Sequence, residues 1–274
     1  MTPDPLFLAT AVEAALAAGR IHRRYFRQHV KVEKKGPIDL VTAADLEVER
    51  EFRTLIGGRF PSHVVLGEEG AADDAARPPK ALVGEGRHRW IIDPVDGTTN
   101  FAHGLPLYCS TIALEVDGEL RVGAVYDPTR DELFTAIRGG GAFLNGEPIR
   151  VSTAATLIDS LLVTGFPYSV QEKLEEMLGL FGRFLSKARA VRRLGSAALD
   201  MCYVAAGRLD GFWEEGLNAW DIAGGVLLVQ EAGGRITSLD GGPFVLRSGR
   251  IIASNGLLHD QMRAVIADYY ASRK

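Results

Sequence analysis

Two aspartates, Asp93 and Asp96, lie three residues apart around a stiff turn, directly after an apolar segment that ends at Ile92. Pro94 restricts the backbone between them, so both carboxylates can point into one small space. The backbone carbonyl of Val95 lies between them as a further oxygen. Hard divalent cations such as magnesium prefer an all-oxygen set of this kind. The segment therefore predicts a cation site.

The next residues predict a place for an anion. Gly97, Thr98 and Thr99 follow Asp96 where the chain turns and a helix can begin. Backbone N–H groups at a helix start lack an intrahelical partner and attract phosphate groups. The alternative interpretation is a pair of surface turns, because Asp-Pro and Asp-Gly dipeptides often form turns.

Three other segments place carboxylates at a strand end or a helix start. Glu68 and Glu69 follow a short apolar segment, Asp221 precedes an apolar run, and Asp45 ends the pattern Thr-Ala-Ala-Asp. Each has a structural alternative: a solvated turn for the glutamates, a helix N-cap for Asp221, and a capping box with Thr42 for Asp45. These structural roles do not explain why acids recur at strand ends and helix starts. We therefore predict that the acids converge on one site.

Apolar periodicity and turn residues predict the elements that must position these acids. Residues 71–87 are rich in Ala, Asp, Pro and Gly and indicate a mobile surface loop. The first half indicates helices on an antiparallel sheet, and the second indicates α/β layers. We expect helices at about 5–26, from Thr42 onward, and at 170–185, 197–206 and 221–232. We expect strands at 63–66, 90–92, 111–116, 121–126, 132–137 and 161–164, with the second of these ending before Asp93.

Composition bounds the class of protein. The chain has 274 residues, 46% of them hydrophobic and 24% charged, with a net charge of −4, so we expect a globular protein and consider nucleic-acid binding unlikely on charge grounds. Cys109 and Cys202 lack the spacing of a zinc site and are expected to be buried and reduced. We find no leader pattern and no run of the roughly 18 apolar residues that a membrane span needs. A cytoplasmic protein is expected.

Several segments resemble the signature motifs of the inositol monophosphatase family. The stretches 93–103 (Asp-Pro-Val-Asp-Gly-Thr-Thr-Asn-Phe-Ala-His), 220–225 (Trp-Asp-Ile-Ala-Gly-Gly) and 231–234 (Glu-Ala-Gly-Gly) are similar to its two signatures, and 67–69 and 39–45 match two further blocks. The resemblance covers nearly the whole chain. It implies a layered αβαβα sandwich of the inositol monophosphatase and fructose-1,6-bisphosphatase type, which combines α+β and α/β layers. It also implies magnesium-dependent hydrolysis of a small phosphate monoester, first of all myo-inositol monophosphate.

The resemblance also implies that five residues bind metal. Together they would hold two to three magnesium ions. Glu68, Asp93 and the Val95 carbonyl match the ligands of a first ion. Asp93, Asp96 and Asp221 match the ligands of a second, and Glu68 borders a third site. The N-terminal half, 1–150, would carry Glu68, Asp93 and Asp96, and the C-terminal half, 151–274, would carry Asp221, in one compact unit with the site between the halves.

Catalytic and substrate-binding roles follow from the same resemblance. Thr98, oriented by Asp45, matches a residue that positions the attacking water, with Glu68 as the third catalytic residue. The amides of Gly97 and Thr98 match phosphate contacts, and a lysine of the Lys34-Lys35 pair lies near a family lysine. The substrate-binding positions are Asp96, Gly195, Ser196, Ala197, Glu214 and Asp221.

Other functions stay open at this point. Within the superfamily, fructose-1,6-bisphosphate, histidinol phosphate or 3′-phosphoadenosine phosphate are alternative substrates. A regulatory or RNA-associated protein with a retained metal site is an alternative of another class, supported by the basic residues between Arg183 and Arg193. A magnesium site with a purely structural role is a third. Family members usually form homodimers, so a homodimer is expected.

Overall fold

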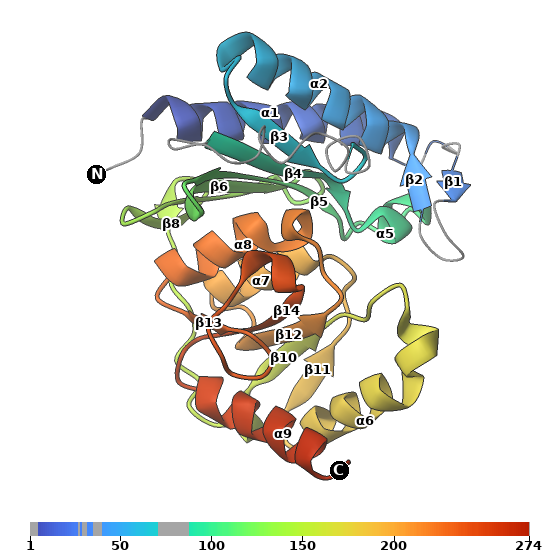
Figure 1. The fold of residues 1–274 in the computed structure, drawn as a ribbon, viewed down its shortest axis with the longest axis vertical. Helices are drawn as coiled ribbons and strands as arrows, with labels where there is room; N and C mark the ends of the chain where they lie inside the picture. The colour runs from blue at the N-terminus through green and yellow to red at the C-terminus, as the bar shows by residue number, and fades with distance from the viewer. Residues whose placement is uncertain (1–4, 27, 29–31, 35–39, 71–87, 274) are drawn as a thin grey trace.

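Five alternating layers of helices and sheets make up the protein (Figure 1). The structure is a computed structural model, which describes residues 5–26, 28, 32–34, 40–70 and 88–273. The layers run from a helix pair through a seven-stranded sheet, a second helix pair and a five-stranded sheet to a third helix pair. This arrangement confirms the layered αβαβα sandwich expected from the sequence. None of the helices in the described residues has both the length and the apolarity needed to cross a bilayer.

The first two layers come from the N-terminal half of the chain. In the seven-stranded sheet β3 and β4 are parallel, and each later neighbour is antiparallel, in the order β3-β4-β5-β6-β7-β8-β9. The first helix pair covers its outer face (Figure 1). The elements are α1 (Pro5–Tyr25), α2 (Ala43–Arg59), β3 (Val64–Gly67), β4 (His88–Asp96), α5 (Thr98–Ala102), β5 (Cys109–Val116), β6 (Glu119–Asp127), β7 (Glu132–Ile137), β8 (Gly141–Leu144) and β9 (Glu147–Pro148), with a separate ribbon of β1 (Val32–Lys34) and β2 (Leu40–Thr42).

The end of β4 differs from the prediction in a way that matters for the acids. We expected the strand to end before Asp93, but it continues to Asp96. Its pairing with β5 shifts between Asp93, opposite Thr111, and Asp96, opposite Cys109. Such an irregularity inserts an extra residue and re-aims the side chains on either side of it. The Pro94 turn is therefore a distortion within the sheet edge and not a loop beyond it.

The remaining layers come from the C-terminal half. Their sheet has the order β11-β10-β12-β14-β13, in which β10 is parallel to both its neighbours and β14 is antiparallel to both of its own. The sequence patterns did not anticipate β12, β13, β14 or α9. The elements are β10 (Leu161–Thr164), α6 (Leu174–Leu185, preceded by a 3₁₀ turn at Val170–Lys173), β11 (Ala190–Arg192), α7 (Ala197–Ala205), β12 (Gly211–Glu215), α8 (Ala219–Glu231), β13 (Arg235–Thr237), β14 (Arg250–Ser254) and α9 (His259–Ala271), with 3₁₀ turns at Leu157–Asp159 and Leu246–Ser248.

The middle helices α7 and α8 lie between the two sheets and join the halves (Figure 1). Both are apolar on nearly every side, as expected for helices that contact protein on two faces. Glycine permits close contact with the first sheet: a Cβ added to Gly224 of α8 would lie 2.5 Å from Thr111 Oγ1 and 3.1 Å from Val125. A Cβ added to Gly123 of β6 would in turn meet the backbone of Gly224.

We expect Gly224→Ala to lower the free energy of unfolding by about 1–3 kcal/mol, because the new methyl group overpacks the contact between α8 and the sheet. Chemical denaturation measures the change. Gly182→Ala in α6 is the matched control, because a Cβ there meets no atom within 4 Å and the residue is exposed. That substitution should be neutral or stabilising by up to about 1 kcal/mol. Equal effects of the two substitutions would contradict the packing argument.

Candidate active site

The end of β4 holds Asp93 and Asp96 in a fixed, buried geometry. The Val95 amide donates a hydrogen bond of 3.0 Å to Asp93 Oδ1, which orients that carboxylate over its own turn. Gly97 follows in the left-handed conformation with φ of 97°. A Cβ at this position would also lie 2.9 Å from the Leu107 carbonyl oxygen, so both backbone and space require glycine. The short helix α5 then begins at Thr98, as the sequence predicted for a helix start.

Asp45 forms the capping box with Thr42 that was the structural alternative for this residue. It also contacts Thr98, the predicted catalytic threonine. Its Oδ2 accepts hydrogen bonds from the Thr42 amide (2.8 Å) and hydroxyl (2.5 Å), which completes the capping box of α2. Its Oδ1 lies 3.3 Å from Thr98 Oγ1. The same hydroxyl lies 2.8 Å from the Val95 carbonyl oxygen. The Thr98 proton is therefore directed toward these two acceptors, and the oxygen lone pairs are left for another donor.

Asp96 is bound by the start of α7, on the other half of the chain. Its Oδ2 accepts a hydrogen bond from Ser196 Oγ at 2.6 Å and from the Ala198 amide at 2.7 Å. Burial raises the pKa of Asp96 to about 6, and these hydrogen bonds oppose the rise. Ser196, predicted to contact substrate, also caps α7 by accepting from the Leu199 amide at 3.3 Å. Its side chain thus has a contact that the sequence patterns did not indicate.

Asp221 lies in the first turn of α8, where its Oδ2 accepts a hydrogen bond of 2.6 Å from the Asn218 amide. Asn218 is the N-cap, so the N-cap interpretation of Asp221 is wrong by three positions. Burial raises the pKa of Asp221 to about 8, and the charge of Asp96 adds to the rise.

The acids meet at Asp93. Burial raises its pKa well above the ordinary value, and the charges of Glu68, Asp96, Asp221 and Asp45 raise it further, in that order. Buried charges are screened less than exposed ones, so the ranking shows only that these four carboxyl groups lie near enough to act on Asp93. Segments as distant in sequence as β3 and α8 therefore bring their acids to one place. The roles assigned to these acids stay predictions.

One group of three close acids in the described residues includes two that were not predicted ligands, Asp45 and Glu69. Asp45, Glu68 and Glu69 each offer a carboxylate oxygen, and these atoms lie within 4.8 Å of one another. Glu68 and Glu69 are partly exposed, whereas Asp45 is buried. The cluster continues toward Asp93 through Glu68 and Asp45, since both charges act on that carboxyl group. Among the described residues, Asp93, Asp96 and Asp221 are not part of this close group.

The predicted substrate-contacting residues lie around this group. Glu214 is buried at the end of β12, where burial raises its pKa to about 8, and the charges of Asp221 and Asp96 contribute to that rise. Its carboxylate fills the space beside Gly165, where a Cβ would lie 2.1 Å from Oε2. Gly195 has φ of 95°, and Asn100 Nδ2 donates to the adjacent Leu194 carbonyl at 2.8 Å. Ala197 is the first residue of α7 and is buried.

Two supporting residues escaped the sequence analysis. His22 of α1 is fully buried, and its Nε2 donates a hydrogen bond of 2.9 Å to the Pro94 carbonyl. Burial lowers its pKa to about 4, so the ring is neutral at neutral pH. The sequence did contain a signal for this role. His22 comes four residues after the buried Ala18, on the apolar side of the helix, and a histidine buried there needs a polar partner. The other residue, Glu49 of α2, holds the turn after Glu68 through two amide hydrogen bonds.

A surface hollow of about 460 Å³ lies beside this turn, lined among the described residues by Leu46, Glu49, Arg50, Arg53, Thr54, Glu69 and Gly70. Its lining includes neither Asp93, Asp96 nor Asp221. The hollow therefore borders the acid cluster only through Glu69. Lys35 and residues 71–87 lie outside the described residues, as does the side chain of Lys34, so the lysine and loop predictions stay untested.

The donor set at the site is suited to a hard cation. Burial disfavours ionisation of Asp93, and the charges of carboxyl groups from both halves of the chain add to the effect. A divalent cation would replace the protons and remove the repulsion. Oxygen ligands of this type match magnesium better than the softer transition metals. The residues therefore fit the cofactor that the resemblance implied.

We expect the metal-free protein to lose stability as pH rises from about 4 to about 8. The folded state keeps a proton on Asp221 up to about pH 8, whereas the unfolded chain releases it near the ordinary value of 3.8. The folded state therefore binds more protons in this window, and the free energy of unfolding falls with pH. Thermal unfolding in a chelator, at about pH 5 and about pH 8, measures the effect. Asp221→Asn should flatten the slope; an unchanged slope would contradict the assigned pKa.

Comparisons with known proteins agree with this geometry. Residues 6–271 match the model of the inositol monophosphatase family. The inositol-1-monophosphatase of Mesorhizobium japonicum is 43% identical over 253 residues, 92% of each chain. Nus factor SuhB of Pseudomonas aeruginosa is 41% identical over 90% of this chain and 91% of that relative. The solved structure of the Anabaena inositol monophosphatase has a TM-score of 0.83 at 39% identity and covers 96% of both chains. The chain belongs to the inositol monophosphatase family.

Proposed function

We propose that this protein is a magnesium-dependent phosphatase that hydrolyses a small phosphate monoester, with myo-inositol monophosphate as the first candidate. The match of residues 6–271 to the inositol monophosphatase family carries the proposal, and the close carboxylates of Asp45, Glu68 and Glu69 beside Thr98 support it. The names of the Mesorhizobium japonicum and Rhizobium meliloti relatives, both inositol-1-monophosphatases at 43% and 42% identity, support the substrate. A phosphoric monoester hydrolase is the enzyme class that this combination indicates.

The predicted ligands Glu68, Asp93, Val95 (through its carbonyl), Asp96 and Asp221 would hold two to three magnesium ions. Bound magnesium supplies Lewis acidity, which activates water and neutralises charge on the phosphate and leaving group. The site lies between the proposed halves 1–150 and 151–274, since Asp221 comes from the second of them. Each half alone would lack ligands, so we propose that the two act as a single unit.

Asp45 and Thr98 would hold the attacking water. The Thr98 proton points to Asp45 Oδ1 and the Val95 carbonyl, so its oxygen can accept a hydrogen bond from water. This chain of donors and acceptors fixes the water and gives its proton a path toward Asp45. Glu68 lies in the same cluster as Asp45 and would accept from that water as well. The amides of Gly97 and Thr98, at the start of α5, would bind the phosphate oxygens.

The hydroxyl groups of the substrate would contact the residues around Glu214. Burial raises the pKa of Glu214 to about 8, so at neutral pH its carboxyl group can both donate and accept hydrogen bonds with a polyol, and burial strengthens such bonds. Ser196 would contribute through its backbone, since its hydroxyl already donates to Asp96. The full set proposed to contact substrate is Asp96, Gly195, Ser196, Ala197, Glu214 and Asp221.

Asp93→Asn should abolish turnover, by about 10³-fold or more, and leave the fold intact, because the neutral amide cannot join two cation sites. Magnesium-dependent release of phosphate from myo-inositol monophosphate measures it. Asp268→Asn is the matched control, since Asp268 is exposed on α9. Normal magnesium-dependent rates in Asp93→Asn would refute the proposed site.

Asp221→Asn should raise the magnesium concentration needed for half-maximal activity and also depress turnover, because it removes one charged ligand while the amide oxygen remains. A magnesium titration at saturating substrate separates the two effects. An unchanged titration curve would argue against Asp221 as a ligand. A panel of esters that includes fructose-1,6-bisphosphate, histidinol phosphate and 3′-phosphoadenosine phosphate would rank the substrates.

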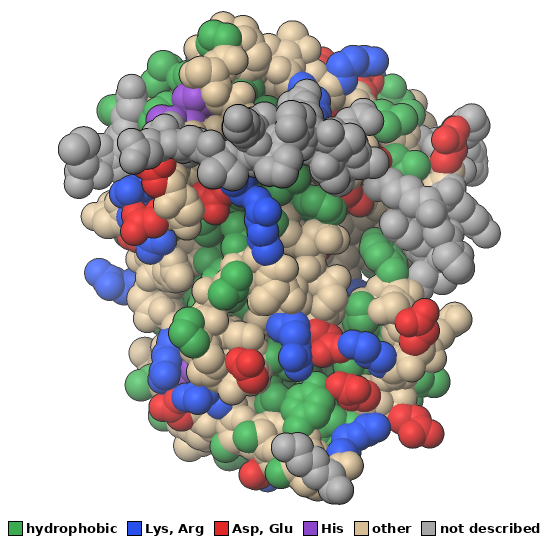
Figure 2. Space-filling view, in the orientation of Figure 1, with side chains coloured by type: hydrophobic (Ala, Val, Ile, Leu, Met, Phe, Trp, Pro, Cys, Tyr) green, Lys and Arg blue, Asp and Glu red, His purple; other side chains and the backbone are tan. Residues whose placement is uncertain are grey.

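A second candidate function is RNA-associated regulation, for which the exposed basic residues are the supporting feature; relatives named Nus factor SuhB are 40% and 41% identical. The basic residues Arg183, Lys187, Arg189, Arg192 and Arg193 are exposed, and Arg189 pairs with Asp159 at 3.1 Å. Figure 2 shows acidic and basic side chains interspersed on the viewed face, which favours a solvated surface there. Filter binding with RNA would test this function independently of phosphatase activity.

We also propose a homodimer. The exposed leucines of α6, Leu174, Leu178 and Leu185, each show about half of their surface to solvent, and an apolar stripe of this kind favours contact with another chain. Light scattering after size exclusion measures the mass in solution, and a monomer at micromolar concentration would contradict the proposal.

A further inference from the structure

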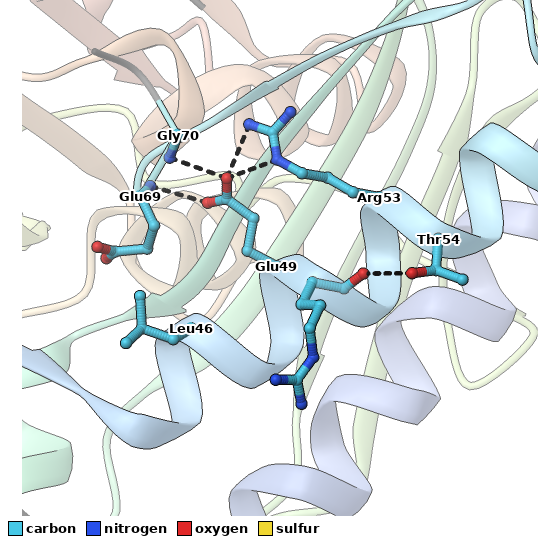
Figure 3. Close-up of a pocket in the computed structure, with 7 residues that line it drawn as sticks. Leu46, Glu49, Arg53, Thr54, Glu69 and Gly70 are labelled. Atoms are coloured by element: carbon cyan, nitrogen blue, oxygen red, sulfur yellow. Dashed lines mark hydrogen bonds and ion pairs between the residues drawn. The ribbon is translucent and has the colours of Figure 1, made fainter. Parts of the chain in front are cut away.

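The carboxylate of Glu49 connects helix α2 to the turn that carries Glu68 through hydrogen bonds. The Glu69 amide donates to Glu49 Oε2 at 2.8 Å, and the Gly70 amide donates to Oε1 at 2.9 Å. Arg53, one helical turn later, contacts Oε1 through Nε and through Nη2, each at 2.8 Å. Figure 3 shows the Glu49 carboxylate between the Arg53 side chain and the two backbone amides. All of these donors bind the Glu49 side chain, which is only 5% exposed.

The turn itself is shaped to receive this pair. A Cβ added to Gly67 would lie 2.5 Å from the Glu49 carboxyl carbon, and one added to Gly70 would lie 2.2 Å from Arg53 Nη2. Glycine at both positions therefore permits the carboxylate and the guanidinium to lie directly against the backbone. Glu68 is between these glycines, and its backbone is fixed on both sides. The close approach argues for a specific contact and not for incidental surface pairing.

The charge on Glu49 adds strength that a neutral acceptor lacks. Hydrogen bonds from amides to an ionised carboxylate are about twice as strong as neutral ones. Arg53 supplies the opposite charge that a buried carboxylate needs. Asp45 lies one turn earlier on the same helix and reaches Thr98. Helix α2 therefore links the Glu68 turn to the Asp45–Thr98 pair as one rigid body.

We propose that Glu49 is a positioning residue for Glu68, which sets the geometry of the magnesium site without contacting magnesium or substrate. The proposal rests on the proposed function, because it takes Glu68 as a metal ligand. Partners that orient a metal ligand in this way typically change metal affinity by about 10–100-fold when they are removed. The effect of Glu49 should therefore appear in magnesium affinity more than in the binding of substrate.

The test is Glu49→Gln, which keeps the shape of the side chain but places an NH₂ group against N–H donors. Calorimetry with magnesium alone should show binding about 10-fold weaker or worse than wild type. Hydrogen exchange should become faster at the Glu69 and Gly70 amides. Glu51→Gln, the same chemical change at an exposed position of α2, is the matched control and should leave both measurements unchanged. Arg53→Lys keeps the positive charge and should weaken magnesium binding in the same direction by a smaller factor.

The outcomes separate this inference from the proposed function. If wild type binds magnesium and Glu49→Gln binds it equally well, the inference is overturned and the proposed function stands. A lower unfolding temperature in Glu49→Gln with unchanged magnesium affinity likewise reduces Glu49 to a structural role. If wild type binds no magnesium, both fail together. Weaker magnesium binding with a near-normal KM for the phosphate ester supports the positioning role.

Discussion

Repulsion among buried carboxylates is the constraint that the rest of the structure must satisfy. Asp93 is surrounded by four other acids, and burial alone already disfavours its ionised form. The fold offsets part of this cost by directing helix N-termini at the acids. Asp45 and Asp221 lie in the first turns of α2 and α8, and Asp96 accepts hydrogen bonds at the start of α7. The partial positive charge of such helix ends stabilises anions, so three helices offset part of the repulsion that bound cations would otherwise have to neutralise alone.

The features of this site that depend on neighbouring residues could be predicted from the sequence. The capping box at Thr42, the turn at Gly97 and the helix starts near Ala197 and Asp221 all depend on residues within a few positions of one another, and short-range chemistry decides them. The acids could be identified because strand ends and helix starts are recognisable in a single sequence. Their convergence was predicted from type and order, and the family motifs then supplied the roles.

The parts that could not be predicted depend on contacts between distant segments. The bond from Ser196 to Asp96 joins residues one hundred positions apart, and that from His22 to Pro94 joins residues seventy-two apart. No local pattern encodes such pairs, because each partner also has an ordinary local interpretation. Strand β12 was missed for a related reason: it is buried along its whole length, so it lacks the polar and apolar alternation that marks a half-exposed strand.

Each acid at the site has its own anchor, and the anchors differ in strength. Asp96 is held by a hydroxyl and an amide of α7, Asp221 by an amide of its own helix, and Asp93 by the next amide but one along its strand. Glu68 lies on a turn at the edge of the sheet, where β3 has one neighbouring strand among the residues that the structure describes. A residue at such an edge depends on side-chain contacts for its position, since the ladder constrains it from one side only. The buried Glu49 carboxylate supplies the second side, because it accepts hydrogen bonds from the Glu69 and Gly70 amides of that turn.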